Sequence, residues 1–123
     1  MRTDNQVLND SKSFALRIIR LYNYLKEEKQ IYVLSKQLLR CGTSIGANVR
    51  ESINAQSRMD FINKLNIALK EANETEYWLE LLHESDFLDD KQFESIYGDC
   101  GKIAATLTKI IKTTKNASDN NGQ

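Results

Sequence analysis

The only histidine of the chain, His83, follows Glu80 by three residues. On a bundle helix, a Glu-x-x-His motif supplies ligands to a pair of iron or manganese ions, but the complete site needs a second motif and two further glutamates. One histidine cannot complete it, so we interpret His83 as a polar residue near a helix end, where a cation is favourable. The sequence also lacks the motifs of nucleophile elbows, phosphate-binding loops, dithiols and zinc proteases. It therefore predicts no catalytic, cofactor-binding or metal-binding residue.

Polar side chains recur at helical spacing in two other segments. Residues that are three, four or seven positions apart share one face of a helix. The first polar stripe is Arg40, Ser44, Asn48 and Glu51, and the second is Lys64, Glu71, Glu74 and Trp78. If the two faces oppose each other, Arg40 pairs with Glu71 or Glu74, and Asn48 bridges the two helices.

Three interpretations of these stripes stay open. They form a site for a ligand or partner, a structural polar network that fixes the register of two helices, or two solvated faces. We favour a structural or subunit-interface role, because polar groups between helices can specify register. Glu71 and Glu74 have the chemistry for acid–base work, but the sequence places no nucleophile with them.

The stripes belong to a chain whose apolar residues recur every three or four positions, which is typical of amphipathic helices. This period predicts helices at about residues 10–27, 31–55, 58–84 and 89–115. The sequence contains no proline and the connections are short, so consecutive helices are expected to be antiparallel neighbours. We expect an all-α, antiparallel up-down-up-down four-helix bundle at residues 10–115, a flexible segment at 1–9 and a disordered tail at 116–123.

Local signals support this arrangement. Two pairs of residues resemble capping boxes at helix starts, Ser57 with Asp60 and Asp89 with Gln92. Gly42 and Gly46 lie four positions apart inside the second predicted helix, where each glycine costs about 1 kcal/mol relative to alanine. They make one face of that helix thin, so we expect another helix to pack closely against it.

Charge is distributed unevenly, although the formal net charge is zero. The net charge is +5 over residues 1–59, −8 over residues 60–99 and +3 over residues 100–123. A neutral chain with a pI of about 6.6 is not typical of a nucleic-acid binder that depends on global charge. Segments of opposite sign can instead complement each other within the fold or between subunits. The candidate phosphate contacts are Arg17, Arg20, Lys109 and Lys112, for which a solvated helix face is the commoner outcome.

Other features bear on compartment and partners. Cys41 and Cys100 fall on apolar stripes and match no disulfide or zinc pattern, so we expect buried free thiols. The first residues are polar and lack the apolar core of a signal peptide. No apolar run approaches the roughly 20 residues that span a bilayer. These features predict a cytoplasmic protein that does not contact membranes.

Two segments resemble the signature of a bacterial family. They are Gln37–Glu51, with the pattern Arg-x-x-x-Ser-Ile-x-x-Asn-x-x-Glu, and Asp60–Thr75. The family is that of the four-helix bundle proteins named after the 23S rRNA intervening sequence, and the resemblance covers about residues 10–115. It implies up-down-up-down bundles that form ring-shaped homopentamers, without an established activity. The motif positions carried over to this chain are Arg40, Ser44, Asn48, Glu51, Glu71 and Glu74.

The accessory protein of diversity-generating retroelements is similar in fold to this family. It is a basic pentamer that engages nucleic acid and a reverse transcriptase, whereas the present chain has no net charge. Ser52 also stands where many family members have glycine. The sequence therefore favours a non-enzymatic, self-associating bundle, with a homopentamer implied by the resemblance. The alternative is a nucleic-acid-binding accessory protein similar to the retroelement bundle.

Overall fold

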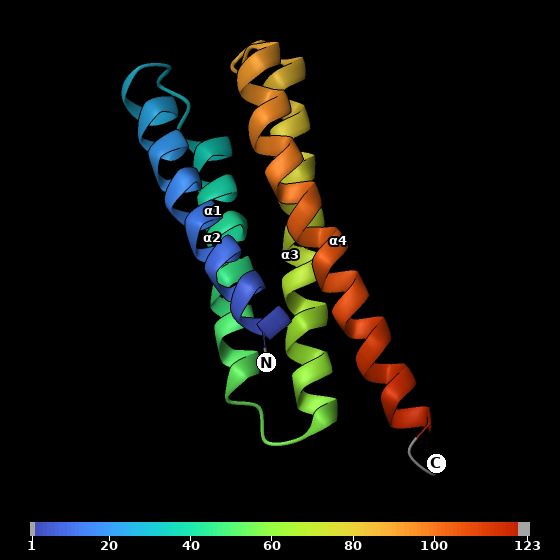
Figure 1. Cartoon of the computed structure of the whole chain (residues 1–123). Helices are drawn as coiled ribbons and strands as arrows, with labels where there is room; N and C mark the ends of the chain where they lie inside the picture. The colour runs from blue at the N-terminus through green and yellow to red at the C-terminus, as the bar shows by residue number, and fades with distance from the viewer. Residues whose placement is uncertain (1, 121–123) are drawn as a thin grey trace.

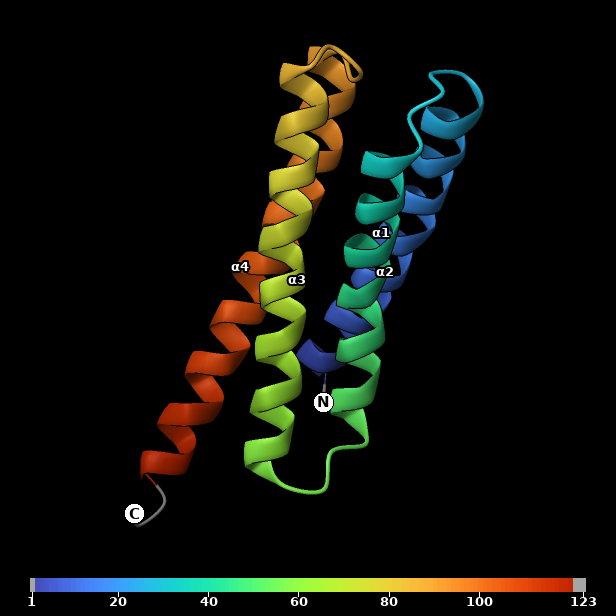
Figure 2. The same cartoon turned by 180° about the vertical axis from the view of Figure 1, so that it is seen from behind.

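The computed structural model describes the backbone of residues 2–120 and the side chains of residues 6–117, and this part of the chain is all-α. The helices are α1 (Arg2–Glu27), α2 (Val33–Ile53), α3 (Arg58–Glu84) and α4 (Asp90–Asn120). Figure 1 shows that the connections after α1 and α3 lie at one end of the molecule and the connection after α2 at the other. The helices thus form two hairpins, α1–α2 and α3–α4, which pack side by side. Both views show the second half of α4 leaning away from the α1–α2 hairpin (Figures 1 and 2).

The first and last helices extend beyond the expected limits of the bundle at both ends. Residues 2–9, expected to be flexible, belong to α1, where Val7 is buried and continues the stripe through Ser11 to Phe14. Because Ser11 is polar, the apolar pattern did not show that the stripe continues to Val7. Residues 116–120 of the expected tail extend α4, because no glycine or proline follows Gly101 before Gly122. The remaining parts of these two expectations, residues 1 and 121–123, lie outside the described residues.

The two capping signals predicted at the starts of α3 and α4 are confirmed. The Oγ of Ser57 accepts a hydrogen bond of 3.0 Å from the backbone N–H of Asp60. At the start of α4, the Asp89 N–H donates to the Gln92 side chain at 3.1 Å, and the Gln92 N–H donates to the Asp89 side chain at 2.7 Å. This reciprocal pair is a complete capping box, so both donors at the helix start are satisfied.

The break between α3 and α4 also falls where the sequence indicates. Asp86 has a φ of 65°, a left-handed conformation that ends helices. Its N–H donates to the carbonyl of His83 at 3.0 Å, and the Phe87 N–H donates to the carbonyl of Leu82 at 2.9 Å. These two bonds reverse the chain over a few residues, so α4 returns along α3.

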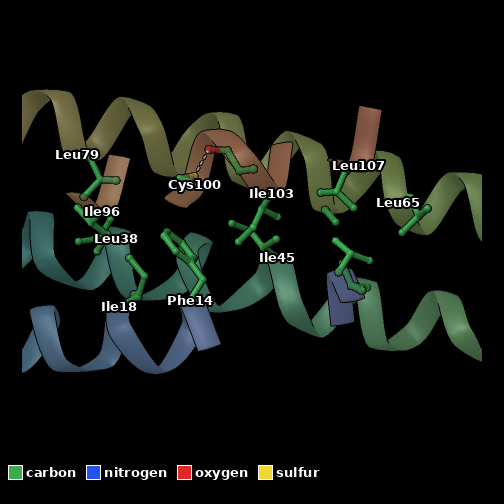
Figure 3. Packing of buried hydrophobic residues seen from close by; sticks show 14 of the residues in the cluster. Phe14, Ile18, Leu38, Ile45, Leu65, Leu79, Ile96, Cys100, Ile103 and Leu107 are labelled. Carbon is green, nitrogen blue, oxygen red and sulfur yellow. Dashed lines mark hydrogen bonds between the residues drawn. The ribbon is translucent and has the colours of Figure 1, made fainter. Parts of the chain in front are cut away.

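The core lies between all four helices and is made by the predicted stripes (Figure 3). Its fully buried side chains include Ile18 of α1, Ile45 of α2, Leu79 of α3 and Leu107 of α4. Four apolar residues that share this helical period are only half buried and pack against the core, namely Leu21, Leu34, Phe61 and Phe93. Buried hydroxyl groups are satisfied within their own helices, as when Thr75 donates to the carbonyl of Glu71 at 2.7 Å.

The thin face of α2 packs against α1, as its glycines predict. A Cβ atom added to Gly42 would lie 2.8 Å from Cγ1 of Ile18, and one added to Gly46 would lie 3.2 Å from the backbone oxygen of Ser11. Larger residues would therefore hold the two helices further apart. None of the four helices, over the residues that the structure describes, has an apolar stretch long enough to cross a membrane.

Candidate functional site

The two polar stripes meet along the line where α2 packs against α3. We call this line the polar seam. Its interacting side chains are Arg40, Glu51, Lys64, Glu71, Glu74 and Trp78. The short connection at residues 54–57 returns the chain directly onto α2, so two faces with helical spacing come to lie against each other.

Arg40 joins the two helices at the centre of the polar seam. Its Nη2 atom donates to Oε1 of Glu74, and its Nη1 atom lies 3.5 Å from Oε1 of Glu71. Its Nε atom donates to the side chain of Gln37 at 3.4 Å. The predicted pairing is confirmed, and Arg40 contacts both carboxylates at once. The sequence did not single out Gln37, whose only signal is its position one turn before Arg40.

Two further contacts extend the polar seam in both directions. The Nζ of Lys64 lies 3.2 Å from Oε1 of Glu51, so the far ends of the two stripes also pair. The indole Nε1 of Trp78 donates to Oε1 of Glu74 at 3.3 Å. Glu74 therefore accepts from Arg40 on the opposite helix and from Trp78 on its own helix, and these two bonds fix the position of its carboxylate.

Ser44 and Asn48 do not take part across the polar seam. The Ser44 hydroxyl donates to the carbonyl of Arg40 at 2.6 Å, and the Asn48 Nδ2 donates to the carbonyl of Ser44 at 2.9 Å. Both bonds stay within α2, so the expectation that Asn48 bridges the two helices is wrong. Short polar side chains reach the carbonyl one turn back on their own helix more easily than a neighbouring helix.

Glu71 is the most enclosed charged group of the polar seam. Its side chain is 18% exposed, and its Oε1 atom is buried without a hydrogen bond among the described residues. The charge of Arg40, 3.5 Å away, is the interaction that offsets this burial. A buried acceptor without a hydrogen bond lowers the stability of the fold. The position of Arg40 therefore determines how much Glu71 destabilises the folded state.

Replacing Arg40 with alanine is expected to lower the free energy of unfolding by about 1 kcal/mol, because Glu71 loses the cation with which it pairs. The value is modest because Arg40 is half exposed, and exposed ion pairs contribute about 1 kcal/mol or less. Urea denaturation followed by circular dichroism measures the change. Lys112→Ala, at an exposed position of α4, is the control and should change stability by less than about 0.5 kcal/mol. Equal effects of the two variants would contradict the role given to Arg40.

In the structure, Glu80 and His83 contact different partners on α4. Glu80 accepts a hydrogen bond of 2.7 Å from the hydroxyl of Tyr97 on α4. The Nε2 of His83 lies 2.7 Å from Oδ1 of Asp90, and its ring stacks on Phe93 at 4.2 Å between centroids. Within residues 6–117, no three His, Cys, Asp or Glu side chains are grouped so that they could hold a metal ion. Both residues instead connect the end of α3 to the start of α4.

The hydrogen bond to Glu80 is the main reason why the pKa of Tyr97 is raised from 10.0 to about 12, with smaller contributions from burial and from the charges of Glu80 and Glu76. The folded protein thus holds this phenol proton more tightly than the unfolded chain does. The stabilisation is present below pH 10 and is lost as the pH rises toward 12.

An ultraviolet titration should therefore show a late tyrosine ionisation, that of Tyr97, at a pH of about 12. Glu80→Gln removes the negative charge and should move this late step toward the ordinary pKa of 10.0. Tyr97→Phe should abolish it. Circular dichroism recorded at each pH identifies the range in which the protein is folded. A single ionisation step in the folded wild-type protein would show that the Tyr97 bond to Glu80 does not persist.

The two thiols are buried and free, as predicted. The thiol of Cys100 donates to the carbonyl of Ala72 at 3.4 Å, and that of Cys41 to the carbonyl of Leu38 at 3.6 Å. Burial raises the pKa of Cys41 and raises that of Cys100 to about 12. Both groups are therefore protonated at neutral pH, and a protonated thiol is a poor nucleophile.

The four basic candidates are not brought together in one site. Arg17 donates to Asp99 and to Ser95 on α4, both at 2.6 Å. Arg17 and Arg20 line a groove between α1 and α4, which also contains Lys102. The other two candidates, Lys109 and Lys112, are exposed further along α4. Arg17 is thus already paired, and the remaining positive charge is spread along the helix.

The helices and the polar seam define a four-helix bundle whose middle helices are joined by a charged motif. The chain belongs to the family described as the 23S rRNA-intervening sequence protein family, which matches residues 3–109. This match confirms the resemblance of the sequence motifs.

A crystal structure of a related protein shows the same fold. It is a protein with unknown function from the S23 ribosomal protein family of Bacteroides thetaiotaomicron, and it is 58% identical to this chain. The match covers 89% of this chain and 98% of the other, with a TM-score of 0.89. No curated protein matches the chain. Family and fold are thus clear, and the function has to be inferred from the surface of the bundle.

Proposed function

We propose that this chain is a non-enzymatic interaction module of the bacterial cytoplasm, an antiparallel up-down-up-down bundle that assembles with copies of itself. The observation that carries the proposal is the set of large apolar side chains that face solvent. Leu16 and Ile19 are 50% and 40% exposed and lie three positions apart on α1. On α3, Met59, Ile67 and Tyr77 are 72%, 41% and 54% exposed. Interfaces between identical subunits are enriched in such groups.

The resemblance of the sequence to ring-forming relatives suggests five as the number of copies. Most soluble oligomers are built from one kind of chain and have closed symmetry. In this proposal the polar seam has a structural role, because its ion pairs form between α2 and α3 of a single chain. The exposed apolar faces are then the surfaces through which copies meet.

Native mass spectrometry at several protein concentrations tests the proposal. We expect a persistent species with five times the mass of the 14.1 kDa chain. A monomer at every concentration would overturn the proposal, and another fixed stoichiometry would correct the number while leaving self-association in place.

Nucleic-acid binding is the second candidate, and the groove between α1 and α4 favours it. Arg20 and Lys102 line this groove without an ion pair to any described side chain, so they are free to meet phosphates. Asp10 and Asp99 lie in the same groove and oppose this role. Fluorescence anisotropy with labelled RNA and DNA at increasing salt tests it, since phosphate contacts weaken steeply with salt. Absence of binding at low salt would exclude this candidate.

A further inference from the structure

The two hairpins carry charge of opposite sign. Residues 11–50, which contain most of α1 and α2, have eight basic side chains and only two acidic ones, Glu27 and Glu28 in and after the last turn of α1. Residues 71–99, around the α3–α4 connection, have ten acidic side chains and one lysine. The contact between the hairpins within one chain uses part of this complementarity, through Arg17 with Asp99 and Arg40 with Glu71 and Glu74.

Further charges on both hairpins point away from these contacts. Lys12 and Arg50 are exposed on the α1–α2 hairpin, and neither pairs with a described side chain. On the α3–α4 hairpin, Glu84 is exposed and Glu76 is half exposed, and they likewise have no cation within ion-pair distance among the described residues. The α1–α2 hairpin thus keeps outward positive charge, and α3 keeps negative charge near its end, that no described side chain neutralises.

The outer side of the α1–α2 hairpin has a groove between its helices. Its floor includes Ala15, Gly46 and Ala47, and Lys12 and Arg50 lie on its sides. The residues of this floor are small, and Gly46 lets the backbones of α1 and α2 approach closely. Next to it, Leu16 and Ile19 leave apolar surface in contact with water. The groove therefore suits an apolar or aromatic side chain flanked by carboxylates.

The outer face of α3 has these properties. Tyr77 is exposed, and its ring packs edge-on against Trp78 at 5.5 Å between centroids, which limits its orientations. Glu84 lies seven positions after Tyr77, on the same helix face.

Glu76 lies at the edge of this face next to α4, where a Cβ added to Gly101 would be 3.8 Å from its Oε2 atom. Burial and the charge of Glu80 raise the pKa of Glu76, and no described cation pairs with it. A cation from outside the chain would offset this negative charge.

From these observations we propose that the α1–α2 groove of one copy receives the outer face of α3 of the next copy. Tyr77 packs on the apolar floor, and Lys12 and Arg50 lie opposite Glu76 and Glu84. This inference rests on the proposed self-association and specifies which surfaces meet. The two surfaces are different, so the contact is head-to-tail, and repeated head-to-tail contacts close into a ring when the rotation allows.

Charge reversal on one or both surfaces tests the proposal. Lys12→Glu with Arg50→Glu makes the groove acidic, and Glu76→Lys with Glu84→Lys makes the α3 face basic. Either pair places like charges against each other and should raise the dissociation constant at least about 100-fold. The chain with all four substitutions again has opposite charges at every contact, so its dissociation constant should return to within about tenfold of the wild-type value.

A mixture of the two double variants gives a second readout. Opposite charges then meet only where the variants alternate, so the mixture should form complexes with equal numbers of each. A ring of five cannot alternate completely, so such rings should be depleted relative to the wild-type protein. Native mass spectrometry distinguishes the two variants by mass, and circular dichroism verifies that each one folds.

Tyr77→Ala supplies a test that reverses no charge. Removal of this aromatic group should weaken assembly about 30-fold, whereas Tyr32→Ala, at another exposed tyrosine, should change it by less than about threefold. A wild-type monomer would overturn the proposed function and this inference together. If the wild-type protein assembles and neither double variant nor Tyr77→Ala weakens it, self-association stands and the proposed surfaces are wrong.

Discussion

Replacing Leu79 with alanine is expected to lower the free energy of unfolding by about 3 kcal/mol, within the range of about 2–5 kcal/mol measured for buried leucines. Leu79 is fully buried in the core shared by the four helices. Figure 3 shows it pointing into this core together with Leu38 of α2 and Ile96 of α4. Alanine would remove apolar contacts with more than one helix and leave a cavity that neighbours fill only in part. The loss is large because small domains are stabilised by only about 5–15 kcal/mol.

Urea denaturation at fixed protein concentration measures this loss, and Ile67→Ala on the same helix is the matched control. Ile67 is 41% exposed, so its removal should change the stability of a single chain by less than about 0.5 kcal/mol. If copies assemble through this helix, the effect of Ile67→Ala should grow with protein concentration, because association stabilises the folded state. The effect of Leu79→Ala should persist at every concentration. Similar effects of both variants at low concentration would contradict the assigned core.

The sequence was sufficient to predict four helices, because each helix must bury one apolar face. Ile18, Ile45 and Leu107 recur at the period that predicts burial, and they are buried. The pattern failed where a polar residue occupies a core position. Ser11 and Thr75 can be buried because each hydroxyl donates to a carbonyl of its own helix, so that no polar group is left without a hydrogen bond. Such residues cannot be distinguished from exposed ones by hydropathy alone.

The polar seam was predictable to the level of helix faces but not of individual bonds. Spacing was enough to oppose Arg40 to Glu71 and Glu74, since long side chains meet wherever two faces meet. For Asn48, the outcome depended on competition between a carbonyl of α2 and a partner on α3, and the local bond was formed. Periodicity carries no information about such local competition.

The outer groove of the α1–α2 hairpin was not predicted at all. Its lining comes from two helices, and neither Ala15 nor Ala47 stands out in the sequence. The groove exists because Gly46 brings the helices close, so its position depends on how α1 and α2 pack. The available signal was indirect, through the glycine spacing and the apolar Leu16 and Ile19 outside the core stripe. Surfaces of this kind require the tertiary structure.

Replacing Gly42 with alanine is expected to lower the free energy of unfolding by about 2 kcal/mol, although alanine favours helices by about 1 kcal/mol over glycine. The added Cβ would lie 2.8 Å and 2.9 Å from Cγ1 and Cγ2 of Ile18. Both atoms are attached directly to the Cβ of a fully buried, β-branched residue, so they cannot move away without shifting α1. Overpacking of a core typically costs about 1–3 kcal/mol, and here it outweighs the gain in helix propensity.

Gly98→Ala is the matched control, because, apart from the adjoining backbone of α4 itself, no described atom lies within 4 Å of the Cβ that it would add. This variant should gain about 0.5–1 kcal/mol from helix propensity alone. Ile18→Ala combined with Gly42→Ala removes the clashing atoms, so the two substitutions together should cost at least about 1 kcal/mol less than the sum of their separate effects. Thermal and urea denaturation of the four variants measure these differences. If Gly42→Ala stabilises the protein as Gly98→Ala does, then α1 and α2 do not approach closely at Gly42, and the smooth groove that the neighbouring Gly46 provides loses its structural basis.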